Sequence, residues 1–134
     1  MGATTIWERW DGVKPDGDFQ NAGMNSFNHY AYGAIGDWMY RVIGGIDTYE
    51  DGPGYRHSRI EPRPGGGLTY ANCDLATIYG KLSSHWRIEK GNFYLDVLVP
   101  VGTTSEVCLP DGNKVTAGPG AHHYAVKSAN GMYR

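Results

Sequence analysis

A carboxylate between two indole rings is the first feature of this chain that could do chemistry. Glu8 follows Trp7 directly and precedes Trp10 by two residues. Indole rings can partly desolvate a neighbouring carboxylate, which raises its pKa and suits it to proton transfer near neutral pH. Their faces can also stack on the apolar faces of sugar rings. The alternative is an exposed glutamate at a helix start, with both tryptophans in the core.

A histidine beside small residues is the second candidate. His29 falls on one face of an expected helix together with Gly33 and Gly36, at steps of four and three residues. An imidazole over such a groove can hydrogen-bond a ligand hydroxyl or orient a carboxylate. The alternative is a histidine satisfied by backbone groups where helices pack.

Two other motifs resemble ligand sites only superficially. His122 and His123 are adjacent, and neighbouring residues of a strand point to opposite faces, so they cannot bind one ion without a bulge. The Pro-Gly-Gly-Gly run at 64–67 is followed neither by Lys-Ser/Thr nor by a helix, so it is not a phosphate loop. We therefore expect no metal site and no cofactor.

One amphipathic helix is expected over residues 24–46 to position the N-terminal candidates. Asn25 or Ser26 can cap its start, and the glycines 44–45 can end it. Its apolar stripe must be covered by the rest of the chain, by a second copy or by helices outside this chain, so self-association through this face is one expectation. The stripe comprises Met24, Phe27, Ala31, Ile35, Trp38, Val42 and Ile46.

From residue 56 onward the pattern is β. Six to eight short runs are separated by Gly, Pro or Asn-Gly-like turns, of which 89–92 and 110–114 are typical of hairpins. The alternation is clearest in Phe93, Leu95, Val97 and Val99. Short strands with no intervening helix predict an antiparallel sandwich. The fold class is therefore mainly β: an antiparallel β-sandwich preceded by one amphipathic helix.

Composition excludes several classes of function. A length of 134 residues suits one domain or slightly more, and the net charge of −2 lacks the basic footprint of a nucleic-acid-binding protein. No apolar run is long enough to span a membrane, and the first residues are too polar for a signal peptide. The compartment is not determined, and cytoplasmic, periplasmic and secreted locations all stay open. Cys73 and Cys108 lie in apolar runs outside any CxxC motif. Two buried free thiols are expected, and a disulfide stays open.

Several long segments together resemble the C-terminal end of bacterial α-L-rhamnosidases of glycoside hydrolase family 78. The resemblance runs from Gly2 to about Tyr124. The segments that carry it are GATTIWERWDG (2–12), GMNSFNHYAYGAIGDWMYRVIGGI (23–46), HSRIEPRP (57–64), ANCDLATIYGKLSSHWR (71–87) and PVGTTSEVCLPDG (100–112).

The resemblance implies a domain organisation and an activity. The family has a catalytic barrel of six helical hairpins followed by an antiparallel β-sandwich, and it hydrolyses terminal α-L-rhamnose with inversion. Residues 1–50 would be the C-terminal remnant of that barrel, the helix being its last, and residues 51–134 would be the sandwich. Rhamnose-containing glycosides are the expected partners, with no nucleic acid and no membrane.

The resemblance also implies roles for individual residues. Glu8, in the Thr-Ile-Trp-Glu motif, corresponds to the general base, and His29, in the Asn-His-Tyr motif, to a histidine of the rhamnose subsite. Trp7 and Trp10 would help to wall the site. The family's general acid lies on an earlier barrel segment that nothing here matches, so we expect a truncated fragment that is inactive alone.

Two other interpretations stay open. The chain can be a stand-alone carbohydrate-binding sandwich, with Tyr70, Tyr79, Trp86 and Tyr94 as a sugar platform. Alternatively, residues 55–134 can be a structural cap that stabilises the helical barrel and binds nothing.

Overall fold

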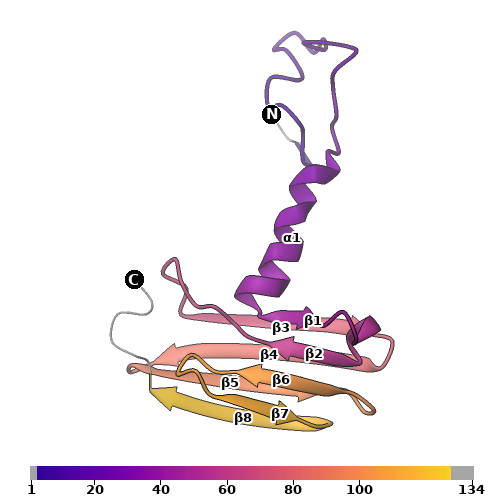
Figure 1. The fold of residues 1–134 in the computed structure, drawn as a ribbon. Helices are drawn as coiled ribbons and strands as arrows, with labels where there is room; N and C mark the ends of the chain where they lie inside the picture. The colour runs from indigo at the N-terminus through magenta and orange to yellow at the C-terminus, as the bar shows by residue number, and fades with distance from the viewer. Residues whose placement is uncertain (1–2, 128–134) are drawn as a thin grey trace. The chain divides into compact units, whose positions relative to one another are not determined.

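The structure is a computed structural model that describes residues 3–127. The chain divides into two compact units, Met1–Asp37 and Trp38–Arg134. Figure 1 labels the main helix and the strands of these units. No helix among the described residues is long and apolar enough to cross a membrane.

The helix is shorter than the apolar spacing predicts. Three consecutive helical segments form it: the 3₁₀ segment η1 (Tyr30–Gly33), the α-helix α1 (Ala34–Trp38) and the π segment η2 (Met39–Ile43). Capping by Asn25 or Ser26 is therefore wrong, because His29 holds the cap position. The expected stop at the glycine pair is confirmed.

Backbone pairing explains the late helix start. The His29 N–H donates to the carbonyl of Ile6 at 2.8 Å, and the Glu8 N–H donates to the carbonyl of Ser26 at 2.8 Å. The Thr5 hydroxyl also donates to the carbonyl of Phe27. Each residue has a single backbone proton to donate, so His29 cannot also bond four residues back in a helix. Residues 26–29 therefore run alongside the N-terminal segment.

Gly45 ends the helix because no other residue fits there. Its φ is 73°, in the left-handed region, and a Cβ at this position would lie 2.1 Å from the backbone nitrogen of Pro62. The chain then enters strand β1 (Ile46–Thr48). This strand has no signal in the sequence, because Ile46 fits the helical stripe equally well.

The second unit contains two four-stranded sheets (Figure 1). One has the order β1-β2-β6-β7 and the other β3-β4-β5-β8. The remaining elements are η3 (Pro53–Tyr55), β2 (His57–Ile60), β3 (Tyr70–Thr77), β4 (Gly80–Glu89), β5 (Asn92–Val99), β6 (Thr104–Cys108), β7 (Lys114–Ala117) and β8 (Gly120–Lys127). The predicted sandwich after a helix is confirmed; the pairing is antiparallel except between β2 and β6, which run parallel.

The core lies on the inner sides of these strands. Phe93, Leu95, Val97 and Val99 are all buried, which confirms the predicted alternation of β5. Trp86 is 1% exposed, and its indole N–H donates to the carbonyl of Ile43 at 2.8 Å. This bond satisfies the only polar atom of the ring while the ring itself leaves water.

Hairpin turns and free thiols are also as predicted. Lys90 and Gly91, between β4 and β5, have φ values of 50° and 76°, the conformation that a tight two-residue hairpin turn requires. Cys73 and Cys108 are buried and unpaired. Burial raises the pKa of the Cys73 thiol to about 11. At neutral pH this thiol is protonated and unreactive.

Candidate functional site

The backbone of Glu8 is held on both sides. Its N–H donates to the carbonyl of Ser26 at 2.8 Å, and its carbonyl accepts from the Tyr32 hydroxyl at 3.3 Å. The segment around Glu8 is therefore tied to the helix start by contacts more than 15 residues away in sequence. The carboxylate side chain remains 37% exposed, so water and ligands can reach it.

His29 is brought next to this carboxylate by the same backbone pairing. Its Nε2 lies 3.9 Å from Glu8 Oε1. That distance is too long for a hydrogen bond, but it lets one water or ligand hydroxyl bridge the two groups. Among the described residues, the buried Nδ1 of His29 has no hydrogen-bond partner. The ring lies between Tyr30 and Tyr32, with centroid distances of 5.8 and 5.5 Å.

The two tryptophans stand beside the carboxylate. The rings of Trp7 and Trp10 are 6.2 Å apart and tilted by 39°. The rings of Trp7 and Phe27 pack in a T-shaped arrangement with their centroids 5.0 Å apart, whereas Trp10 is largely exposed. A cavity of about 380 Å³, within the usual size range of small-ligand sites, is lined by Ile6, Trp7, Glu8, Trp10, Tyr32 and Ile35. His29 does not line it but lies against Glu8.

Three residues of this cavity were not among the site residues expected from the sequence: Ile6, Tyr32 and Ile35. Tyr32 and Ile35 line it, three and six residues after His29 in the chain. Tyr32 follows His29 by one helical step, which was the available signal, whereas Ile35 fell on the predicted apolar stripe away from His29. Tyr32 matters most, because its hydroxyl contacts the Glu8 backbone and its ring lies beside the imidazole.

The chemistry open to this cavity is limited by its single carboxylate. Glu8 is the only acidic residue lining it. The nearby Asp11 is paired with Arg9 at 2.9 Å and does not line the cavity. A lone carboxylate between indoles can take a proton from water. It cannot also supply the acid that an inverting glycosidase needs on the opposite side of the sugar.

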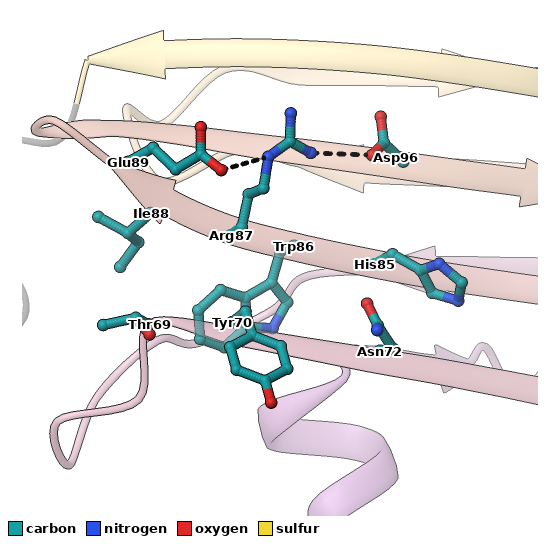
Figure 2. Close-up of a pocket in the computed structure, with 9 residues that line it drawn as sticks. All are labelled: Thr69, Tyr70, Asn72, His85, Trp86, Arg87, Ile88, Glu89 and Asp96. Carbon is teal, nitrogen blue, oxygen red and sulfur yellow. Dashed lines mark hydrogen bonds and ion pairs between the residues drawn. The ribbon is translucent and has the colours of Figure 1, made fainter.

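A second polar region lies on the solvent face of β3, β4 and β5. Figure 2 shows the residues that line its groove, with Arg87 joined to Glu89 and Asp96. The four-residue sugar platform that the sequence left open as an alternative does not form there. Trp86 lies in the core, because it alternates along β4 with the outward-facing His85 and Arg87. Tyr70 is 66% exposed, and Tyr94 is half-buried.

The adjacent histidines have separate partners. His122 Nε2 lies 2.7 Å from the carbonyl of Gly118, and His123 Nδ1 lies 2.6 Å from Asp96 Oδ1. Between residues 3 and 127, no group of three or more His, Cys, Asp or Glu side chains is arranged to hold a metal ion.

Comparison with known proteins places these units in one family. Residues 45–123 match the bacterial α-L-rhamnosidase C-terminal domain, and residues 1–43 match the bacterial α-L-rhamnosidase six-hairpin glycosidase domain. An α-L-rhamnosidase of Streptomyces avermitilis is 50% identical over 109 residues, which cover 81% of this chain and 10% of that protein. One from Formosa agariphila is 46% identical over 113 residues, covering 84% of this chain and 12% of that protein.

Solved structures of α-L-rhamnosidases are also similar to this chain. The Streptomyces avermitilis α-L-rhamnosidase complexed with L-rhamnose superposes with a TM-score of 0.80 at 43% identity, covering 94% of this chain and 14% of that one. The native α-L-rhamnosidase of Aspergillus terreus gives a TM-score of 0.79 at 44% identity, and the match covers 92% of this chain and 14% of that one. The chain thus spans 10–14% of the length of these relatives. The family resemblance seen in the sequence is confirmed, and the chain belongs to the bacterial α-L-rhamnosidases, with residues 45–123 as their C-terminal domain.

Proposed function

We propose that this chain is the C-terminal part of an inverting α-L-rhamnosidase that releases terminal α-L-rhamnose from glycosides, and that Glu8 is its general base. The observation that carries the proposal is the position of the Glu8 carboxylate in an indole-lined cavity, 3.9 Å from His29. Residues 1–50 are then the end of the catalytic barrel and residues 51–134 the sandwich. The change of matching family model between residues 43 and 45 supports a division in this region.

In this mechanism Glu8 takes a proton from a water molecule. The water oxygen bonds to the anomeric carbon from the face opposite the aglycone, and the bond from that carbon to the glycosidic oxygen breaks. The electron pair leaves with the oxygen, which a second carboxylic acid protonates, roughly 6.5–9.5 Å from the base. Trp7 and Trp10 wall the sugar, and His29 holds a sugar hydroxyl or the water against Glu8.

The second carboxylic acid must come from another part of the enzyme. Glu8 is the only acidic residue lining this cavity, and Asp11 is already paired with Arg9. We therefore expect no appreciable rhamnosidase activity from the 134-residue chain by itself. An assay with an aryl α-L-rhamnoside measures this directly. Turnover by the chain that Glu8→Gln abolishes would contradict the need for a second segment.

The role of Glu8 is tested in a complete enzyme. This chain replaces the matching segment of the Streptomyces avermitilis α-L-rhamnosidase, and the chimera is assayed with and without Glu8→Gln. Removing a general base costs about 10²–10⁴-fold in kcat. The matched control is Glu50→Gln, an exposed glutamate outside the cavity, which should leave kcat unchanged. An equally active Glu8→Gln chimera would exclude the general-base role.

We also propose that the chain alone self-associates through its helix. On this helix, Ile35, Trp38 and Met39 are each about half exposed, which is unusual for large apolar side chains on one short segment. Light scattering at increasing protein concentration tests this: the apparent mass should rise. Replacing both Trp38 and Met39 by Asp should lower it, whereas a constant monomer mass would contradict the proposal.

A further inference from the structure

The pairing of β3, β4 and β5 aligns polar and aromatic side chains in two rows across the solvent face. Tyr70 pairs with Arg87, which pairs with Tyr94. In the next row, Asn72 pairs with His85, which pairs with Asp96. Side chains on alternate residues of a strand share a face, so both rows face solvent, opposite the core. A groove of about 440 Å³ lies along them (Figure 2).

Arg87 is immobilised at the centre of this groove. Its guanidinium carbon lies 4.7 Å from the centroid of the Tyr94 ring, Nε donates to Glu89 at 3.1 Å and Nη1 donates to Asp96 at 3.2 Å. His123 holds Asp96 from the other side at 2.6 Å. The donors and acceptors are therefore already oriented before any ligand arrives, which lowers the entropic cost of binding.

The charges in the groove disfavour an anionic ligand. Arg87 is the only Lys or Arg lining the groove, and both Glu89 and Asp96 neutralise it. A phosphate or carboxylate would have to compete with these two side chains. A neutral molecule with many hydroxyls can instead donate to the carboxylates and accept from the guanidinium and amide N–H groups.

Tyr70 and Asn72 are available to such a molecule. Tyr70 is 66% exposed, and within residues 3–127 neither its hydroxyl nor the Asn72 amide has a protein hydrogen-bond partner. Figure 2 shows the Tyr70 ring between Thr69 on one side and Asn72 and His85 on the other. The ring offers a flat apolar surface, and the amide offers two donors and an acceptor next to it.

We propose that this groove binds a neutral saccharide, with one sugar ring stacked on Tyr70 and its hydroxyls bonded to Asn72, His85 and Arg87. This site is separate from Glu8 and does not depend on the catalytic proposal. It differs from the platform that the sequence left open as an alternative, because Trp86 is excluded and charged side chains supply the specificity.

Titration of the isotope-labelled 134-residue chain tests the proposal by proton–nitrogen correlation NMR. The probes are L-rhamnose, methyl α-L-rhamnoside, D-glucose and, as an anionic counterpart, D-glucuronate. At least one neutral sugar should shift the amides of residues 69–72 and 85–89 with a Kd of about 1–10 mM. Glucuronate should bind more weakly than glucose because of Glu89 and Asp96.

Variants separate this site from the Glu8 cavity. Tyr70→Ala should weaken the neutral sugar at least about tenfold. Tyr30→Ala, which removes a still more exposed tyrosine outside the groove, should not. Asn72→Ala gives a second test that leaves the ring in place and should also weaken binding.

Three results would overturn the proposal: no shift of these amides by any neutral probe at about 100 mM, shifts confined to residues 6–10, or unchanged affinity in both groove variants. The spectra themselves show whether each variant is folded. Glu8→Gln should leave the groove shifts unaltered, so failure of the catalytic proposal and failure of this one are distinguishable.

Discussion

The two compact units of this chain differ sharply in how much they bury. Among residues 3–37, Gly12 is the only buried residue. The unit that begins at Trp38 has a continuous core that joins both sheets and includes Ile46, Ile60, Trp86 and Phe93. Burying a large apolar side chain contributes about 1.5–3 kcal/mol, so the second unit has a source of stability that the first lacks.

The side chains suited to hydrolysis lie in the unit without a core. Glu8, His29, Trp7 and Trp10 depend on a few backbone hydrogen bonds and on aromatic contacts for their positions. Such a site is poorly preorganised by itself, and catalysis depends on preorganisation. The second unit thus has the packing to fold by itself, whereas the catalytic role proposed for Glu8 requires a second carboxylic acid from outside this cavity.

The largest expected effect comes from comparing a tryptophan of each unit. Trp86→Ala removes a fully buried ring and its hydrogen bond to Ile43, and should lower the free energy of unfolding by about 3–5 kcal/mol. Trp10→Ala, at a largely exposed ring, should change it by less than about 1 kcal/mol. Urea unfolding followed by circular dichroism measures both. Similar losses for the two variants would contradict the contrast between the units.

A smaller effect is expected at the end of the helix. Gly45→Ala places a Cβ against Pro62 at a φ of 73° and should cost about 1–3 kcal/mol. Gly65→Ala is the matched control, because nothing lies within 4 Å of a Cβ there and its φ is not in the left-handed region. It should stay within about 0.5 kcal/mol of the parent in the same urea unfolding experiment. An unchanged free energy of unfolding in Gly45→Ala would show that the backbone contact between Gly45 and Pro62 is not rigid.

The smallest effect concerns acid stability of the sandwich. A hydrogen bond from Lys81, followed by those from Ser83 and His85, lowers the pKa of Asp74. Because the folded-state pKa is depressed, this stabilisation is present above the unfolded value of about 3.9 and is lost as the pH falls through the folded-state value. Asp74 is about half exposed, so the contribution is small.

Asp74→Asn should therefore lower the urea midpoint slightly at pH 7, and its difference from the parent should shrink as the pH falls below about 4, whereas the same substitution at Asp111 should show neither effect. Asp111 is exposed in the turn between β6 and β7 and serves as the control. An identical acid dependence in the parent and in Asp74→Asn would show that the Lys81 pairing does not contribute to stability.

Local patterns predicted the second unit better than the first. The turn at Lys90 and Gly91 and the alternation of β5 involve residues next to each other in the chain, so their types alone indicate the structure. Strand β1 was missed because three residues are too few to show a period. The sequence left Trp86 open between the core and a sugar platform, and its burial on β4 decides for the core.

The sequence by itself determined the sandwich and the glycine stop of the helix, because both rest on residue type and short-range spacing. The role of Glu8 as general base came from the family resemblance and stays a prediction. Only the tertiary structure decided where the helix begins and which side chains meet Glu8. Backbone groups of Ile6 and Glu8 and the hydroxyl of Thr5 bond to residues 26–29, and such long-range pairing leaves no periodic trace in either segment. That pairing places His29 and Tyr32 beside the carboxylate, and the register of β3, β4 and β5 likewise assembles the Tyr70 groove.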